Sequence, residues 1–267
     1  MYQFDYARAE SVDQAAQRLS DGAQLLAGGQ TLLASMKQRL TQPEALLDLG
    51  DLSDLVGISE EGTSLVIGAM TRHQQVATDQ RVLHKLPALA HLAGGIGDKQ
   101  VRAMGTLGGS VANNDPAACY PSAVLALNAT VITNRREIAA DDFFQGLYAT
   151  ALEPDELITA VRFPVATRAA YAKFKQPASR YALVGVFVAQ TAQGVRVAIT
   201  GAGNGVFRHQ GLEAALDSQF SPEAIAHVDI DDSELSGDLH ASAAYRGHLI
   251  KIQTQRAVIT AIGTAPT

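Results

Sequence analysis

Cysteine and tryptophan are almost absent from this sequence. Its 267 residues include one cysteine, Cys119, and no tryptophan. A single cysteine excludes an internal disulfide framework and cannot supply an all-cysteine iron–sulfur or zinc site. The seven histidines are scattered, and none belongs to an HExxH motif or a similar close pair with a carboxylate. We therefore expect no metal-binding and no catalytic residue in this chain, so redox chemistry must come from a bound organic cofactor or another subunit.

An excess of positive charge and a long apolar run are also missing. The net charge is -6 at pH 7, whereas binding to nucleic acid or to an anionic membrane needs a basic face. No apolar run approaches the ~18 to 20 residues of a membrane span, and the N-terminus lacks the basic and apolar regions of a signal peptide. We expect a cytoplasmic protein whose partners are small molecules or proteins.

The periodicity of apolar residues predicts an α+β protein with two domains. Residues 1–54 follow a β-α-β-α-β pattern whose first strand covers residues 2–6, and residues 55–165 add hairpins, helices and a strand closed by Pro164. The second domain, residues 166–267, is predicted to contain three strands over 170–176, 181–190 and 194–203, helices near 211–218 and 221–228, and a long helix over about 241–262.

Two glycine-rich corners stand out, each followed by a helical segment. The first is Ala27-Gly28-Gly29-Gln30-Thr31 and the second is Thr106-Leu107-Gly108-Gly109-Ser110. Glycine lets backbone N–H groups approach a phosphate, and a helix dipole favours the negative charge. Each corner alone is more often a simple tight turn than a phosphate site, and neither matches GxGxxG or a P-loop. Together, they suit the two phosphates of a dinucleotide.

The flanks of both corners carry a resemblance to a known family. LLAGGQTLLASMKQRL with PEALLDL, and then KQVRAMGTLGGSVANNDPAACYPSAVLAL, resemble the FAD-binding middle subunit of molybdenum hydroxylases, the carbon-monoxide dehydrogenase and xanthine dehydrogenase family. The blocks DELITAVRFP, YAKFKQPASRYALVGV and DLHASAAYRGHL extend the resemblance over nearly the whole chain. It implies a two-subdomain FAD-binding domain of the vanillyl-alcohol-oxidase type (PCMH-like), subdomains about 1–54 and 55–165, followed by a small domain with a three-stranded antiparallel sheet and helices.

The resemblance also implies which residues bind the cofactor. It assigns the pyrophosphate and ribityl to the two corners, an apolar contact to two isoleucines, and the flavin ring to a lysine and a tyrosine. The corner residues are Leu26, Ala27, Gly28, Gly29, Gln30, Thr31, Leu32, Thr106, Gly108, Gly109 and Ser110. The isoleucines are Ile96 and Ile158, and the residues at the flavin ring are Lys175 and Tyr181. A cation beside reduced flavin raises its reduction potential. The alternatives are core aliphatics for the isoleucines, a solvated lysine and a core tyrosine.

One position departs from the family pattern. Many relatives carry Asp or Glu thirteen residues after Thr106, where this chain has Cys119. A thiol is a poor hydrogen-bond acceptor, so a contact from this position to FAD is in doubt. Asp115 is expected to cap a helix that begins after Pro116 instead of replacing that ligand.

The function implied by the resemblance is electron transfer. A molybdopterin centre in a large subunit would oxidise the substrate, two [2Fe–2S] clusters in a small subunit would pass electrons to FAD in this chain, and NAD, a quinone or oxygen would accept them. The assembly would be a dimer of heterotrimers. Two alternatives stay open: a self-contained FAD oxidase or dehydrogenase, disfavoured because residues 25–40 contain no histidine or cysteine for a covalent anchor, and a flavin-free scaffold.

Overall fold

The structure is a computed structural model that describes residues 1–263. Its N-terminal part is a small parallel sheet with two helices. The strands lie in the order β1-β3-β2, and both pairs are parallel. The elements are β1 (Asp5–Arg8), α1 (Val12–Ser20), β2 (Gln24–Leu26), α2 (Leu32–Lys37) and β3 (Ala45–Asp48). The β-α-β-α-β prediction is confirmed, except that the first strand begins at Asp5 because its pairing partner in β3 begins at Ala45.

The middle part is a five-stranded antiparallel sheet with short helices packed against it. Its strand order is β4-β5-β10-β6-β7, and a separate hairpin pairs β8 with β9. The elements are η1 (Ser53–Leu55), β4 (Ile58–Glu61), β5 (Ser64–Gly68), α3 (His73–Thr78), α4 (Gln80–Lys85), α5 (Pro87–Gly94), α6 (Lys99–Met104), α7 (Leu107–Asn113), α8 (Tyr120–Ala126), β6 (Thr130–Thr133), β7 (Glu137–Ala139), α9 (Ala140–Phe143), β8 (Phe144–Gly146), β9 (Ala149–Thr150) and β10 (Ile158–Pro164).

The C-terminal part is a four-stranded antiparallel sheet, not the three-stranded sheet that we predicted. Its order is β11-β12-β13-β14, and its elements are β11 (Arg168–Lys175), β12 (Ala182–Thr191), β13 (Gly194–Thr200), β14 (Phe207–Arg208), α10 (Gln210–Ser218) and α11 (Ala243–Gly263). The additional strand β14 has two residues, which pair with Ala198 and Ile199. A strand this short shows no alternation in the sequence, so periodicity does not reveal it. The predicted long C-terminal helix is confirmed as α11.

The helix predicted near residues 221–228 is wrong. This segment folds into successive tight turns, in which N–H groups bond to carbonyls three residues earlier, as in Ala224 to Ser221 and Val228 to Ile225. The turns still bury Ile225 in the core below α11. Helical spacing of apolar residues therefore identified the buried side chain but not the backbone conformation.

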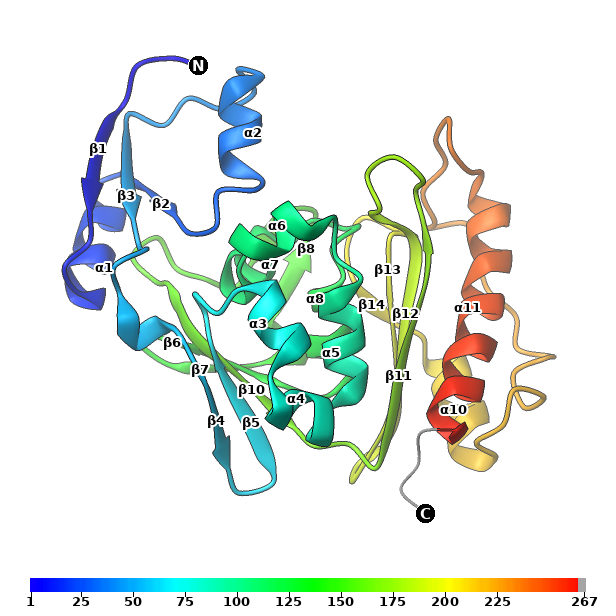
Figure 1. Cartoon of the computed structure of the whole chain (residues 1–267). Helices are drawn as coiled ribbons and strands as arrows, with labels where there is room; N and C mark the ends of the chain where they lie inside the picture. The colour runs from blue at the N-terminus through cyan, green and yellow to red at the C-terminus, as the bar shows by residue number, and fades with distance from the viewer. Residues whose placement is uncertain (264–267) are drawn as a thin grey trace.

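Helices cover both faces of the C-terminal sheet (Figure 1). One face packs against α5 and α8 and the other against α10 and α11. The first eight residues of β12 are all buried, which explains why its sequence is a continuous apolar run and not an alternating one.

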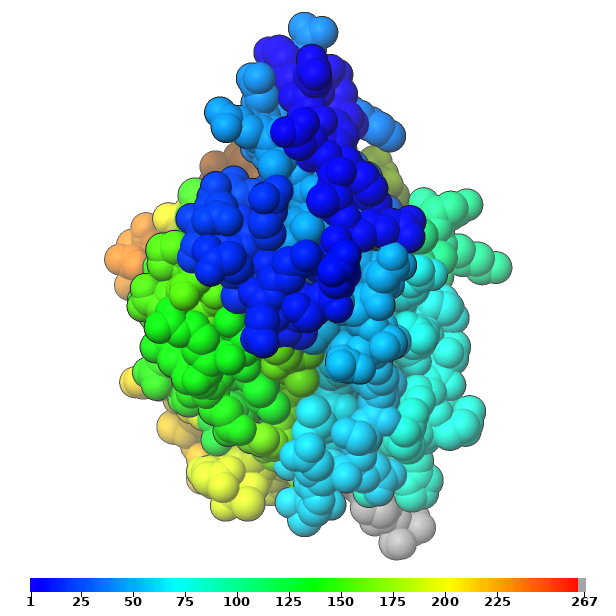
Figure 2. Space-filling view, turned by 90° about the vertical axis from the view of Figure 1, so that its left-hand side faces the viewer, coloured from blue at the N-terminus to red at the C-terminus, as the bar shows by residue number. Residues whose placement is uncertain are grey.

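The N-terminal sheet forms its own lobe. Figure 2 shows it as the blue region standing above the cyan and green segments of the middle part. Its core includes Leu55, Met70 and Leu157 of the middle part, so the lobe is anchored at its base. The subdomain boundary between residues 54 and 55 and the domain boundary between residues 165 and 166 stay predictions. Within residues 1–263, no helix combines the length and the apolarity needed to cross a membrane.

Candidate functional site

The first glycine corner joins β2 to α2 and needs glycine for two separate reasons. Gly29 has a φ of +67°, the left-handed region that residues with a Cβ rarely adopt. A Cβ on Gly28 would lie 2.3 Å from the carbonyl oxygen of Met104, so the corner touches the main chain just before the second corner. The two corners, far apart in sequence, are therefore in direct contact.

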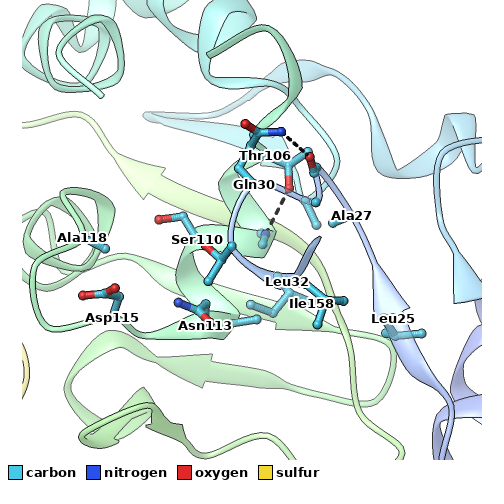
Figure 3. Close-up of a pocket in the computed structure, with 18 of the residues that line it drawn as sticks. Leu25, Ala27, Gln30, Leu32, Thr106, Ser110, Asn113, Asp115, Ala118 and Ile158 are labelled. Carbon is cyan, nitrogen blue, oxygen red and sulfur yellow. Dashed lines mark hydrogen bonds between the residues drawn. The ribbon is translucent and has the colours of Figure 1, made fainter. Parts of the chain in front are cut away.

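The main-chain N–H groups of this first corner are unused. From Gly28 through Leu32, no main-chain N–H finds a hydrogen-bond partner within the described residues. The Gln30 side chain donates from Nε2 to the carbonyl of Gly28 at 3.1 Å, which steadies the turn without using these donors (Figure 3). Consecutive unpaired N–H groups at a helix start make a binding place for an anion such as a phosphate.

The second corner differs from this expectation, because its N–H groups are already paired. Leu107 and Gly108 donate to the carbonyls of Thr71 (3.0 Å) and Ala69 (2.8 Å). Gly109 donates to the hydroxyl of its helix cap, Thr106, at 3.2 Å (Figure 3). Ser110 donates to the carbonyl of the same threonine at 3.1 Å. What this corner can offer a ligand is therefore the hydroxyl groups of Thr106 and Ser110.

Both corners line a cleft of about 890 Å³, a volume within the usual range for an organic ligand. Its walls are partly apolar: Leu25 lines it, and Figure 3 shows Leu32 and Ile158 side by side below the polar side chains of the two corners. The cleft brings together most of the predicted residues: Ala27, Gly28, Gly29, Gln30, Thr31, Leu32, Ile96, Thr106, Gly108, Gly109, Ser110, Ile158 and Tyr181.

Two predicted residues do not line the cleft. Leu26 ends strand β2, and its side chain lies near Gly29 instead. Lys175 is exposed at the end of β11, beyond an irregularity in the pairing with β12. Their roles toward the cofactor stay predictions.

Lys173, which sequence reasoning missed, lines the cleft two residues before Lys175. Its Nζ donates to the carbonyls of Gly95 (2.9 Å) and Arg180 (3.0 Å) and contacts the Sγ of Cys119 at 3.4 Å. Cys119 itself is buried and lies in the cleft wall. The sequence signal was the pair of lysines at alternate positions, which places both on one strand face but does not tell which one reaches the cleft.

Two tyrosines and an aspartate form one end of the cleft. The hydroxyl of Tyr148 donates to Asp115 at 3.4 Å, and Tyr181 lies close enough for the same carboxylate to act on it. Burial, and secondly the charge of Asp115, raise the pKa of Tyr181 above its ordinary value, so its hydroxyl stays protonated. Asp115 does not cap helix α8, which begins at Tyr120; its carboxylate accepts from the N–H of Ala117 in the preceding turn.

His73 lies in the cleft wall behind the second corner. The main-chain N–H of His73 donates to the carbonyl of Gly105 at 2.9 Å, and a Cβ on Gly105 would lie 2.6 Å from the imidazole Nε2. Burial, and secondly the charge of Arg102, lower the pKa of His73 to about 4. The imidazole is therefore neutral at pH 7, and its Nδ1 has no hydrogen-bond partner within residues 1–263. Within the same residues, no group of three or more His, Cys, Asp or Glu side chains could hold a metal ion.

A partly apolar cleft with free N–H donors at one corner and hydroxyls at the other is typical of a site for a phosphate-bearing organic ligand, here in a protein of the α+β class. Comparison with known proteins identifies the family. Residues 2–166 match the family described as the FAD binding domain in molybdopterin dehydrogenase. The carbon monoxide dehydrogenase medium chain of Afipia carboxidovorans is 37% identical, over 96% of this chain and 95% of the relative.

Two further comparisons cover nearly the full length. The nicotine 6-hydroxylase medium subunit of Paenarthrobacter nicotinovorans is 36% identical over 96% of both chains. The solved carbon monoxide dehydrogenase of Hydrogenophaga pseudoflava contains a chain that matches with a TM-score of 0.93 and 35% identity, over 99% of each chain. The chain therefore belongs to the FAD-binding medium subunits of molybdenum hydroxylases, an oxidoreductase family, and its cofactor is FAD.

Proposed function

We propose that this chain holds FAD as the last electron carrier of a molybdenum hydroxylase complex. Electrons from [2Fe–2S] clusters in a small partner subunit would enter here and leave to an external acceptor. FAD can take electrons singly and release them in pairs, which suits a station between clusters and a two-electron acceptor. The chain has one cysteine, so the clusters would belong to another subunit.

One observation supports this proposal most strongly: the unpaired N–H groups of Gly28 through Leu32. These residues are half-buried or exposed, so their N–H groups are accessible to a ligand, and a bound pyrophosphate would satisfy them. Thr106 and Ser110 line the same cleft, and their hydroxyls would complete the contacts to the phosphates and the ribityl chain. The apolar walls at Ile96 and Ile158 suit the flavin ring.

The partners would be a large molybdopterin-binding subunit and a small [2Fe–2S] subunit. This proposal draws on the names of the relatives, which are medium chains or subunits of larger enzymes. A dimer of such heterotrimers and a cytoplasmic location stay predictions. Co-purification of the tagged chain from its native host, followed by analysis for molybdenum and acid-labile sulfide, tests the proposed partners directly.

The cofactor assignment is tested by reconstitution. The full chain, freed of flavin under mild denaturation, is mixed with FAD, dialysed and examined by visible absorption. We expect a retained flavin spectrum in the wild type and its loss in Gly109→Val, because this position lines the cleft and the new side chain would project between the two corners. Gly94→Ala is the control, since its Cβ would find ordinary space, 3.7 Å from Ala77. Equal FAD retention in all three proteins would contradict the assignment.

A self-contained FAD enzyme is the second candidate, favoured because Cys119 lines the cleft and cysteine can anchor a flavin covalently. Acid precipitation separates the two functions. A free flavin in the supernatant fits an electron-transfer subunit, whereas flavin that stays on the precipitated chain and is lost in Cys119→Ala would favour the self-contained enzyme. A scaffold without flavin would retain no FAD in the reconstitution experiment.

A further inference from the structure

One wall of the cleft has no regular secondary structure. Residues 152–157, the wall segment, form neither helix nor strand, and all of them except Asp155 line the cleft together with Ile158, the first residue of β10. Within residues 1–263, a single hydrogen bond between main-chain groups reaches the segment from outside it, from the N–H of Asn134 to the carbonyl of Leu157 at 3.1 Å. The wall segment is therefore held in place mainly by side chains.

A buried carboxylate, Glu156, is the centre of these side-chain contacts. Its Oε1 accepts from the hydroxyl of Thr133 at 2.7 Å and from Nε of Arg136 at 2.9 Å. Its Oε2 accepts from Nη2 of Arg136 at 2.9 Å and from the main-chain N–H of Glu153 at 3.0 Å. The Glu156 side chain is 0% exposed, and the fork from Arg136 is the main cause that lowers its pKa to about 2. The carboxylate is therefore ionised at pH 7.

Two further contacts tie the wall segment to the turn between β6 and β7. Arg136 donates from Nη2 to the carbonyl of Ala151, directly before the segment, at 2.8 Å. At the other end, the N–H of Leu157 donates to Oδ1 of Asn134 at 2.9 Å. Residues of one turn thus fix both ends of the segment, and Glu156 is bound to the same turn between them.

Ile158 follows directly and takes its position from the same contacts. Its pairing partner in β6 is Thr133, whose hydroxyl donates to Glu156. The pairing is irregular between Ile158 and Ala160, so a regular ladder does not set the position of Ile158 by itself. Glu156 therefore helps to decide where Ile158 meets the cleft, beside Leu32 of the first corner (Figure 3).

The same pair decides which buried charge lies behind this wall. The charge of Glu156 is matched by Arg136, whose side chain is 47% exposed. Glu153 also lines the cleft, but its side chain is 59% exposed, so water screens its charge. Asp155 does not line the cleft and pairs with Arg135 at the surface. The buried charge that a ligand would sense from this wall is therefore that of Glu156, balanced by Arg136.

Stability alone does not require an ion pair at this place. Replacing a buried ion pair by apolar side chains of similar volume is often neutral or stabilising, because the cost of desolvation offsets the attraction. What Glu156 and Arg136 add is a set of hydrogen bonds with fixed geometry and two charges that balance beside the cleft.

We propose that Glu156 and Arg136 are positioning residues for the cofactor: they hold the wall segment and Ile158 against the flavin ring and keep this wall electrically neutral. The inference rests on the proposed function, because the flavin ring is the group that Ile158 would contact. Reduced flavin tends to carry a negative charge, so a net charge behind the wall changes the reduction potential of FAD. A lone carboxylate would lower this potential, and a lone guanidinium would raise it.

The test measures the reduction potential of FAD, its Kd and the unfolding free energy in variants of the full chain loaded with FAD. Titration against a redox dye at neutral pH should give a lower potential than wild type in Arg136→Gln and a higher one in Glu156→Gln. Both should bind FAD about tenfold more weakly and unfold more easily, because each breaks the charged fork. Arg136→Lys keeps the charge without the fork, so its FAD affinity should fall while its potential stays at the wild-type value.

Arg135→Gln is the matched control, because it removes the same charge from the neighbouring residue, which is 51% exposed and pairs with Asp155. Its potential and FAD affinity should equal those of the wild type. A merely structural ion pair would lower stability in both fork variants and leave the potential unchanged or shifted in one direction. Either result overturns the inference, as does a shift in Arg135→Gln as large as that in Arg136→Gln.

A further variant covers the case in which Glu156→Gln does not fold. Thr133→Val removes one uncharged donor from the same carboxylate, so it should weaken FAD binding without shifting the potential, and an unchanged affinity would overturn the inference. Failure of the proposed function is a separate result. A wild-type chain that retains no FAD refutes that function and this inference together, whereas an FAD-loaded wild type whose variants all keep its potential refutes the inference alone.

Discussion

The two glycine corners look alike in sequence and differ in what they leave free. Both place a pair of glycines before a helix, and both line the same cleft. In the first corner the N–H groups of Gly28 through Leu32 have no partner within residues 1–263, whereas Leu107 through Ser110 in the second corner are all bonded. The same pattern thus leaves N–H donors free in one place and builds the cleft wall in the other.

The reason lies in what packs behind each corner. The second corner sits against the end of β5, so closely that a Cβ on Gly108 would lie 2.5 Å from the Cβ of Ala69. Its first N–H groups face carbonyls of that neighbouring segment and bond to them. Beside Gly28 the first corner meets the main chain of Met104 and Gly105, and residues Gly28 through Leu32 line the cleft. Four changes test this contrast, from the largest expected effect to the smallest.

Acid should loosen the second corner through His73. Its pKa is about 4 in the folded chain and near 6.5 when unfolded, so the unfolded chain takes up the proton first as the pH falls. The stability it contributes is complete above pH 6.5 and is lost between pH 6.5 and 4, by roughly 3 kcal/mol. Urea unfolding across this range should show a shallower pH dependence in His73→Gln, while His84→Gln, at an exposed histidine, should follow the wild type. Parallel curves for all three would contradict the role of His73.

Gly108→Ala should destabilise the chain whether or not FAD is present. The added Cβ would meet both main-chain and side-chain atoms of Ala69 at 2.5–2.9 Å, and overpacking of this kind costs about 2 kcal/mol. Thermal unfolding of the FAD-free protein measures the loss. The neighbouring change Gly109→Ala should affect FAD more than folding, since the atom it meets first is the Thr106 hydroxyl, 2.9 Å away. A normal melting temperature for Gly108→Ala would remove the packing explanation.

Gly29→Ala, in contrast to Gly108→Ala, should lower the affinity for FAD more than the stability of the fold. A residue with a Cβ pays about 1–2 kcal/mol at a φ of +67°, so the turn would relax and its N–H groups would point differently. We expect FAD affinity to fall about tenfold for 1.4 kcal/mol. Gly29→Asn should lose less, because asparagine tolerates the left-handed region. Fluorescence titration with FAD measures both, and an equal loss in the two variants would exclude φ as the cause.

Thr106→Ala should have the smallest effect, about 1 kcal/mol in unfolding free energy, because it removes the helix cap on the Gly109 N–H. Thr106→Ser keeps the cap hydroxyl and should restore stability. If the same hydroxyl also contacts FAD, as we propose, Thr106→Ala should weaken FAD binding beyond its effect on folding. Urea unfolding and FAD titration on the three proteins separate these contributions.

Much of the fold was predictable because local patterns determine it. The first β-α-β-α-β unit, the hairpin with its turn at Gly62 and the long helix α11 follow from periodicity, glycine placement and helix length. The misses have identifiable causes as well. Strand β14 has two residues, too few for any period, and residues 221–228 have helical spacing but fold into tight turns. Boundaries set by a partner strand, such as the start of β1, are not contained in the strand's own sequence.

The candidate site was predictable in its residues but less so in its chemistry. Both corners were found, and most of the predicted residues meet in one cleft. The lysine is the instructive exception. Lys173 and Lys175 alternate on one strand and read alike, yet only Lys173 lies against Gly95, Cys119 and the segment ending at Arg180. The neighbours that distinguish them come from parts of the chain 54 and 78 residues away in sequence.

The sequence by itself determined where glycine allows the backbone to turn, which runs of residues become strands and helices, and that a lone cysteine cannot supply an all-cysteine iron–sulfur site. The tertiary structure alone decided which N–H groups remain free for a phosphate and which cations face the cleft. The physical reason is that turns and periodic elements depend on neighbours in the sequence, whereas hydrogen-bond partners and charge surroundings depend on neighbours in space. The N–H of Gly108 is paired and that of Gly29 is not, because the segment after β5 lies behind only the second corner.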